Sequence, residues 1–163
     1  MIEIREAGKG DWAGIWPIFR EVVAAGETYV YPADLSQANA RRLWTDPPAM
    51  AYVAVEGGQV LGTYSLRPNQ IGRGRHVANA GYVVSPIARG RGLGRLLCEH
   101  SLEQARRRGY RAMQFNMVVS TNESAVRLWQ RCGFDIVGRL PGAFEHPRLG
   151  DVDGLVMYQR LGQ

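Results

Sequence analysis

The sequence predicts a mixed α/β fold in which helices cover a central sheet. Two observations favour it: short β-rich runs alternate with amphipathic helical segments, and one β-rich run leads through a glycine-rich turn directly into a helix. With 163 residues, 45% of them apolar, the chain suits a single domain over residues 1–163 with a full core. The expected order of elements is β-α-α-β-β-β-α-β-α-β-β.

The boundaries of these elements follow from hydrophobic spacing and from the residues that end each run. The expected strands are residues 2–6, 51–55, 59–66, 76–84, 112–119, 134–137 and 155–161. The expected helices are residues 12–25, 37–44, 92–108 and 122–131. Gly57-Gly58 predicts a tight hairpin between the second and third strands. Residues 138–154 are expected to form a loop between the last two strands.

Polar residues mark three of the helix starts. Asp11 and Ser36 are expected to cap the first and second helices, and Ser120 with Glu123 has the spacing of a capping box ahead of the fourth. Glycines follow the third and fourth helices, where they commonly end a helix.

The net charge of +5 at pH 7 comes almost wholly from arginine, because Lys9 is the only lysine. Such an excess is compatible with a solvated basic surface, a phosphate-rich cofactor or nucleic acid. No run approaches the ~20 apolar residues that a membrane span needs. The charged start, residues 1–6, does not match a signal peptide, so a cytoplasmic protein is expected. Cys98 and Cys132 lack metal-ligand spacing and are interpreted as reduced core thiols, so no metal site is expected.

A glycine-rich turn connects a strand to a helix over residues 83–94, Val-Val-Ser-Pro-Ile-Ala-Arg-Gly-Arg-Gly-Leu-Gly. Glycines let successive backbone N–H groups point into one concavity, and the free N–H groups at the helix start add to it, so the segment favours a phosphate. Arg89 and Arg91 add positive charge. The segment lacks the Gly-Lys-Ser/Thr end of a P-loop, and its glycine spacing differs from that of a dinucleotide-binding turn.

At Arg89, Gly92 and Gly94 the sequence resembles the GNAT N-acetyltransferase superfamily, whose signature is Gln/Arg-x-x-Gly-x-Gly/Ala between the fourth strand and the third helix. A second segment, residues 122–134, is similar to the family's Asn-x-x-Ala, Leu-Tyr and Gly-Phe pattern at the expected distance. The strand order also agrees, so the resemblance covers essentially the whole chain. It implies the GNAT fold, a mixed and mostly antiparallel sheet whose fourth and fifth strands splay apart.

The resemblance further implies that acetyl-CoA lies between those two strands as a co-substrate, with its pyrophosphate on the glycine turn. The backbone of residues 82–84 would pair with the pantetheine arm, and the Tyr82 N–H would face the thioester carbonyl. The implied cofactor-binding residues are Tyr82, Val83, Val84, Arg89, Gly90, Arg91, Gly92, Leu93, Gly94, Arg95 and Asn122. An amine of a small molecule would attack the thioester directly, without a covalent enzyme intermediate.

One position departs from the family pattern. Many relatives have, at the Leu-Tyr position, a tyrosine that protonates the leaving thiolate, whereas this chain has Trp129. An indole is a donor that does not ionise at neutral pH, so Trp129 is expected to pack against the cofactor or the core. Asn122 is then the candidate catalytic residue, placed to hydrogen-bond the departing sulfur. An ordinary asparagine at a helix start is the alternative.

A narrower resemblance concerns the acceptor, and it points to the branch that acetylates azetidine-2-carboxylate and related proline analogues. The segments that carry it are residues 25–29, 78–82, 115–118 and 145–153. It implies that Asn79 binds the substrate carboxylate together with the backbone N–H groups of Asn116 and Met117. Asn79 and Asn116 interrupt apolar strands, where a polar side chain needs a partner. That partner is either the substrate or the backbone.

Glu27, Tyr29 and Tyr31 lie in an aromatic-rich loop and are further candidates to line the acceptor pocket. No histidine or carboxylate has an evident position as a general base. The proton of the amine is therefore expected to leave through water, which makes the rate rise with pH.

Other functions stay open. A protein N-terminus, a polyamine and a phosphinothricin-like amino acid are alternative acceptors. A non-catalytic module that binds acyl-CoA or nucleic acid is a second class, with Arg73, Arg75 and residues 106–108 as a basic patch. Nucleic acid is disfavoured because no strand interleaves aromatic and basic residues. The resemblance suggests a homodimer, and no membrane partner is expected.

Overall fold

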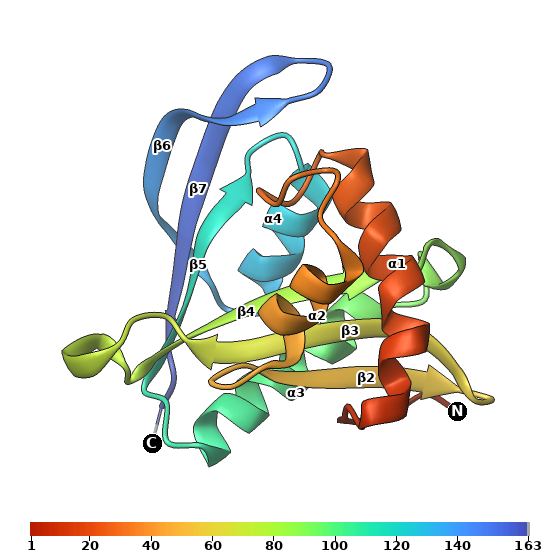
Figure 1. The fold of residues 1–163 in the computed structure, drawn as a ribbon. Coiled ribbons are helices and arrows are strands. Elements are labelled where there is room, and N and C mark those ends of the chain that lie inside the picture. The colour runs from red at the N-terminus through yellow and green to blue at the C-terminus, as the bar shows by residue number, and fades with distance from the viewer. Residues whose placement is uncertain (163) are drawn as a thin grey trace.

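The computed structural model describes residues 1–162, and its elements follow the expected order (Figure 1). The strands are β1 (Glu3–Glu6), β2 (Met50–Glu56), β3 (Gln59–Pro68), β4 (Val77–Val84), β5 (Ala112–Val119), β6 (Asp135–His146) and β7 (Gly150–Arg160). The α-helices are α1 (Trp12–Ala25), α2 (Gln37–Thr45), α3 (Leu93–Arg107) and α4 (Glu123–Arg131). Short 3-10 turns are η1 (Lys9–Asp11), η2 (Gly72–Gly74) and η3 (Pro86–Ala88).

The strands form one sheet in the order β1-β2-β3-β4-β5-β7-β6. Neighbouring strands are antiparallel except β4 and β5, which run parallel. The expected mixed and mostly antiparallel sheet is therefore confirmed. The hairpin between β2 and β3 turns at Gly57-Gly58, whose positive φ angles of 57° and 80° favour glycine.

β4 and β5 pair only near their first residues. The register joins Val77 to Ala112 and Ala78 to Met113, and beyond these pairs the two strands diverge (Figure 1). On its other side β5 pairs with β7, but the register shifts between Phe115 and Val118. The sheet is thus open along one side of β4 and irregular on the facing part of β5.

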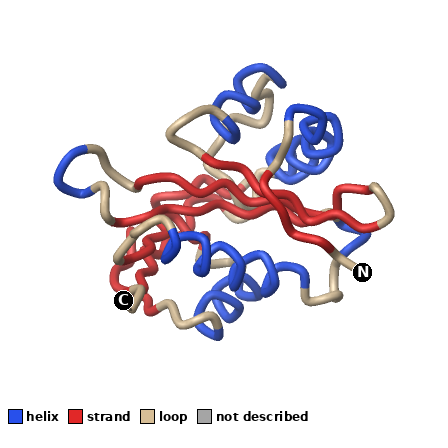
Figure 2. Tube along the Cα trace, turned by 90° about the horizontal axis from the view of Figure 1, so that it is seen from below, coloured by secondary structure: helices blue, strands red, loops and turns tan. Residues whose placement is uncertain are grey.

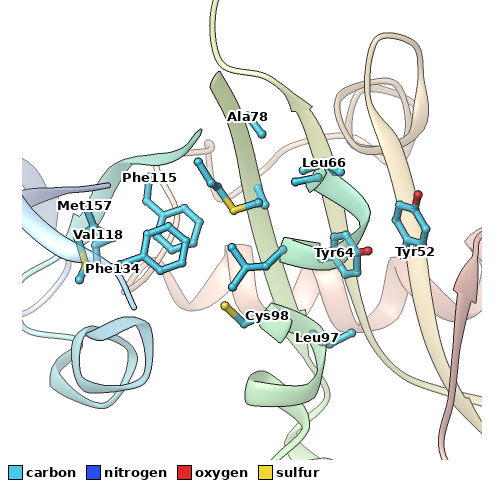
Figure 3. Packing of buried hydrophobic residues seen from close by; sticks show 14 of the residues in the cluster. Tyr52, Tyr64, Leu66, Ala78, Leu97, Cys98, Phe115, Val118, Phe134 and Met157 are labelled. Atoms are coloured by element: carbon cyan, nitrogen blue, oxygen red, sulfur yellow. The ribbon is translucent and has the colours of Figure 1, made fainter. Parts of the chain in front are cut away.

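Helices cover both faces of the sheet (Figure 2). On one face α1 and α2 bury Phe19 and Trp44 against the strands. On the other face α3 buries Leu97 in a second cluster, which also contains the stacked rings of Phe115 and Phe134, whose centroids are 4.2 Å apart (Figure 3). The two apolar clusters hold β3 and β4 between them and so fix the edge of the open region.

The C-terminal part differs from the expectation, because residues 138–154 do not form a loop. β6 and β7 continue as a long hairpin that projects beyond the helices (Figure 1). Most side chains of β6 are exposed, so no alternation of apolar and polar residues marks the strand in the sequence. Pro141-Gly142-Ala143, which is typical of a turn, instead lies in an irregularity between Leu140 and Phe144.

Of the expected helix caps, Ser36 is confirmed, since its Oγ accepts a hydrogen bond from the Asn39 N–H at 3.2 Å. Asp11 does not cap α1. Its carboxylate pairs with the Arg5 guanidinium and accepts the Gly8 N–H, and it makes no hydrogen bond to the amides of the helix.

The capping box of Ser120 and Glu123 is wrong. α4 begins after Asn122, and no side chain caps it. A turn that is closed by a hydrogen bond from the Asn122 N–H to the Val119 carbonyl places Ser120 two residues before the N-cap position, which Asn122 occupies.

Cys98 is buried in α3, Cys132 is half-buried directly after α4, and both thiols are free. Within residues 1–162, no helix is both long and apolar enough to cross a membrane.

Candidate functional site

A groove of about 860 Å³ opens where β4 and β5 diverge, and it extends from the glycine-rich turn to the loop between α1 and α2. Most residues that the sequence assigned to cofactor, substrate or catalysis line it together. These are Asn79, Tyr82, Val83, Val84, Arg89, Gly90, Gly94, Asn116, Met117 and Asn122. The assigned residues that do not line it are Arg91, Gly92, Leu93 and Arg95.

The residues outside the groove belong to the glycine turn and the start of α3. Arg91 pairs with Glu56 of β2 at 2.9 Å, and Arg95 pairs with a glutamate one helical turn further on at 2.6 Å. Leu93 is 1% exposed and packs in the core. Arg89 is the arginine of this turn that has no carboxylate partner within the described residues. The uncompensated positive charge is therefore smaller than the sequence suggests.

The turn has a backbone geometry that suits an anion. Gly90 and Gly92 have φ angles of 76° and 74°, in the left-handed region that other residues adopt only with strain. α3 begins directly after Gly92, so the N–H groups of residues 93–95 have no partner within the helix. Gly94 faces α4, where a Cβ would come within 3.0 Å of the Leu128 Cδ2. Free amides beside Arg89 form the positive end of the groove.

The backbone of β4 presents every second residue to the groove. The Ser85 N–H donates to the Leu61 carbonyl of β3 at 2.8 Å, and the Val77 carbonyl also accepts a hydrogen bond from the β3 side. Residues that pair in this way alternate along an antiparallel ladder. The odd-numbered residues of β4 are thus bonded to β3, and the even-numbered residues face the open side.

This alternation divides the three residues whose backbone was assigned to the cofactor into two that face the groove and one that faces β3. The N–H groups of Tyr82 and Val84 face the groove, whereas the Val83 N–H faces β3. The Tyr82 carbonyl also points outward from the ladder and accepts a hydrogen bond from the Tyr29 hydroxyl at 2.9 Å. Tyr82 and Val84 are therefore the backbone donors of this strand.

Aromatic rings pack beside the groove between the sheet and the helices α3 and α4. The Trp129 ring centroid lies 4.8 Å from that of Tyr82 and 5.1 Å from that of Phe115, so Trp129 packs against the core as expected. The Tyr82 hydroxyl is hydrogen-bonded to the Ser101 Oγ at 2.6 Å, and burial raises the pKa of Tyr82. Neither ring offers a group that ionises near neutral pH.

Asn122 lies at the start of α4 and lines the groove. It is the N-cap residue of α4, but its side chain makes no hydrogen bond to the helix amides. Its Oδ1 accepts a weak hydrogen bond from the Ser124 hydroxyl at 3.3 Å, which leaves the Nδ2 hydrogens for a ligand.

Asn79, Asn116 and Met117 lie together on the facing parts of β4 and β5. The Asn79 Nδ2 donates to the Gln114 carbonyl at 2.9 Å, and the Asn116 Nδ2 donates to the Asn69 Oδ1 at 2.7 Å. Asn79 thus has a backbone partner, although its Oδ1 makes no hydrogen bond within the described residues. Asn116 and Met117 fall outside the paired register of β5 and β7, in a local irregularity of the kind that often borders active sites.

Arg67 of β3 lines the same part of the groove and was not predicted from the sequence. The register of β3 and β4 places it directly opposite Asn79. Its Nη2 donates to the Leu43 carbonyl at 2.6 Å and to the Ser65 Oγ at 2.9 Å. No carboxylate of the described chain pairs with its guanidinium. A half-buried positive charge without a counter-ion favours an anionic ligand.

The loop between α1 and α2 forms the remaining wall, with Glu27, Tyr29 and Tyr31 on it as expected. The Tyr29 and Tyr31 rings stack with centroids 5.6 Å apart, and Tyr29 meets Trp44 edge-on at 6.3 Å. Burial raises the pKa of Tyr29. Glu27 is the one carboxylate among the described residues that line the groove, and it pairs with Arg148 of the β6–β7 turn at 2.6 Å.

The fold and the groove together define a class of α/β proteins with a ligand groove between two diverging strands. Comparison of the sequence with known families identifies this class. A model of the acetyltransferase (GNAT) family matches residues 15–134. The chain belongs to this family.

Solved and curated relatives agree with this assignment. A GCN5-related N-acetyltransferase from Kribbella flavida is 47% identical, with a TM-score of 0.94 over 98% of each chain. YncA from Salmonella typhimurium, solved with its cofactor acetyl-CoA, is 26% identical with a TM-score of 0.85 over 100% of this chain and 95% of that one. The L-methionine sulfoximine/L-methionine sulfone acetyltransferase of Pseudomonas paraeruginosa is 33% identical over 149 residues, 85% of this chain and 83% of that protein. The chain spans less than half the length of the first curated relatives that it matches.

Proposed function

We propose that this chain transfers the acetyl group of acetyl-CoA to the amine of a small amino acid. One observation carries the proposal: a single groove joins the glycine turn with Arg89 to a pocket with Asn79 and Arg67, and neither arginine has a carboxylate partner within the described residues. Open strand backbone lies between them. A long cofactor with phosphates at one end and an acyl group at the other fits this arrangement, and its acyl end would meet a positively charged acceptor pocket.

The residues of the groove fit acetyl-CoA in two respects. Arg89 and the free N–H groups of residues 93–95 would hold the pyrophosphate. The outward-facing backbone of Tyr82 and Val84 would pair with the amides of the pantetheine arm. The acetyl-CoA bound to yncA supports the same choice of cofactor.

When bound, acetyl-CoA supplies a thioester carbonyl that an uncharged amine can attack. We assign the Tyr82 N–H as the donor to the carbonyl oxygen, because a preorganised donor stabilises the negative charge that develops there. Asn122 is assigned to the sulfur, toward which its Nδ2 would donate. Neither Trp129 nor an amide can give up a proton, so the Asn122 hydrogen bond would stabilise the departing thiolate, which would take its proton from water.

The acceptor is assigned as an amino acid because a carboxylate would neutralise Arg67. Asn79, opposite Arg67, and the backbone N–H groups of Asn116 and Met117 would complete the carboxylate site. The aromatic wall of Tyr29, Tyr31 and Trp44 favours a small ring such as that of azetidine-2-carboxylate. Similarity to an acetyltransferase of methionine sulfoximine supports an amino-acid acceptor.

Other acceptors fit the pocket less well. A polyamine would bring further positive charge beside Arg67, and a peptide N-terminus has no carboxylate next to its amine. The proton of the amine would leave through water, since Glu27 is paired with Arg148 and the Tyr29 hydroxyl already donates to a carbonyl. The rate is therefore expected to rise with pH as more of the amine becomes uncharged.

The test is release of coenzyme A thiol from acetyl-CoA with a panel of amines. The panel contains azetidine-2-carboxylate, its carboxamide, methionine sulfoximine, a polyamine and a peptide N-terminus. Turnover of the acids and not of the carboxamide is expected. Arg67→Ala should raise the KM for the acid roughly 10- to 100-fold by loss of charge-assisted hydrogen bonds, with the KM for acetyl-CoA unchanged, while the exposed Arg41→Ala should change neither.

The outcomes separate the parts of the proposal. Turnover of the polyamine or the peptide alone would refute the amino-acid acceptor and keep acetyl transfer. Binding of acetyl-CoA without turnover of any amine would favour a non-catalytic acyl-CoA-binding module. Absence of acetyl-CoA binding would refute the whole proposal.

A further inference from the structure

A second hollow lies at the opposite end of β4 from the glycine turn, and we call it the basic hollow. It has a volume of about 500 Å³ and is lined by Gly72, Arg73, Arg75, His76 and Arg111. Its residues come from η2 and the two residues before β4 on one side and from the residue before β5 on the other. The Arg111 N–H donates to the His76 carbonyl at 2.8 Å, so the two sides are joined where β4 and β5 begin to pair.

The basic hollow gathers positive charge that nothing in the described chain compensates. Within residues 1–162, Arg73, Arg75 and Arg111 pair with no carboxylate, whereas eight other arginines do. The one side-chain bond found among the three runs from the Arg75 Nη1 to the Gly72 carbonyl at 3.4 Å. Like charges that converge on one hollow repel each other, and a bound anion relieves that repulsion.

The basic hollow is separate from the acetyl-transfer groove. Seven residue steps along β4 separate Val77 from Val84, which at ~3.3 Å per residue amounts to about 23 Å. Phosphates held at the glycine turn therefore cannot reach it. No residue lines both cavities.

We propose that the basic hollow binds a small phosphate-bearing molecule. Guanidinium groups match phosphate oxygens through forked pairs of N–H donors, and His76 adds a further donor. The volume lies in the range of small-molecule pockets. Single-stranded nucleic acid is a poorer match, because its sites combine a long basic track with aromatic side chains for base stacking, and the described lining has neither.

The test is calorimetric titration of inorganic pyrophosphate into protein whose groove is saturated with coenzyme A. The wild type should bind one pyrophosphate. Arg73→Ala/Arg75→Ala/Arg111→Ala should weaken the binding about tenfold or more. The control Arg20→Ala/Arg41→Ala/Arg131→Ala removes the same charge from exposed arginines outside both cavities and should bind like the wild type.

A second variant, Arg73→Gln/Arg75→Gln, leaves the start of β5 untouched and guards against misfolding of the triple variant. It should also bind pyrophosphate more weakly than the wild type. Equal binding by all variants, or equal loss in the control, would overturn the proposal. Binding of a single-stranded oligonucleotide that depends on these arginines, with no pyrophosphate binding, would overturn it in favour of a nucleic-acid surface.

Discussion

The hydrogen bond between the Tyr29 hydroxyl and the Tyr82 carbonyl links the acceptor loop to β4, at 2.9 Å. Tyr29→Phe removes the hydroxyl and keeps the ring, so the packing on Tyr31 and Trp44 is retained. The Tyr82 carbonyl is left without this donor at a partly buried position. A lost bond of this kind costs about 1–2 kcal/mol, which for a chain of this size lowers Tm by roughly 2–8 °C.

Urea unfolding and thermal unfolding measure the loss, and Tyr31→Phe is the matched control. The Tyr31 hydroxyl makes no hydrogen bond within the described residues, so its removal should change the free energy of unfolding by less than about 0.5 kcal/mol. We also expect Tyr29→Phe to raise the KM for the acceptor, because the loop forms one wall of the pocket. Wild-type stability of Tyr29→Phe, or an equal loss in Tyr31→Phe, would show that the bond does not anchor the loop.

Three further predictions follow from the same geometry. Asn122→Ala should lower kcat roughly 10- to 100-fold with little change in the KM for acetyl-CoA; steady-state kinetics with unchanged kcat would remove Asn122 from the mechanism. In Gly154→Ala the new Cβ would lie 2.1 Å from the Met117 sulfur, so this side chain must move. Because a methionine side chain is flexible, we expect a loss of less than about 1 kcal/mol in urea unfolding together with a raised acceptor KM; a wild-type KM would contradict this packing. The hydrogen bond from Arg5 holds the pKa of Asp11 below its usual value. Asp11 therefore stabilises the fold above its unfolded pKa of about 3.9, and this stabilisation is lost as the pH falls further. The free energy of unfolding of Asp11→Asn should depend less on pH between about 5 and 2 than that of the wild type, and an equal pH dependence of the two proteins would refute the role.

The glycine turn could be predicted because the backbone angles and the close packing that it requires fall on neighbouring residues. Gly90 and Gly92 need positive φ angles, and Gly94 must let α4 approach, so each requirement falls on a residue type that the sequence displays. The strand before the turn and the helix after it have clear apolar periodicity. The position and the backbone geometry of the turn can therefore be inferred from about a dozen adjacent residues, residues 83–94.

The acceptor pocket was less predictable because it depends on strand register. Arg67 becomes a candidate binding residue only when the register of β3 and β4 places it opposite Asn79. The residues of either strand alone do not determine this register. For the same reason the ion pair of Arg91 could not be predicted, since its partner Glu56 is 35 positions earlier in the chain. The last two strands were predicted, but the part of the β6–β7 hairpin formed by residues 138–154 was expected to be a loop, because most side chains of β6 are exposed and leave no apolar signal.

The excess of arginine in the sequence is interpreted differently when the carboxylate partners of each guanidinium are known. Eight arginines pair with carboxylates, so part of their charge is already compensated within the fold and an anion would gain less from them than from an unpaired arginine. Among the arginines that have no such partner within residues 1–162, those that line a cavity are Arg67, Arg73, Arg75, Arg89 and Arg111. An uncompensated charge in a concave site gains most from an anion. Pairing within the fold, rather than the number of arginines, therefore decides where phosphates and carboxylates are expected to bind.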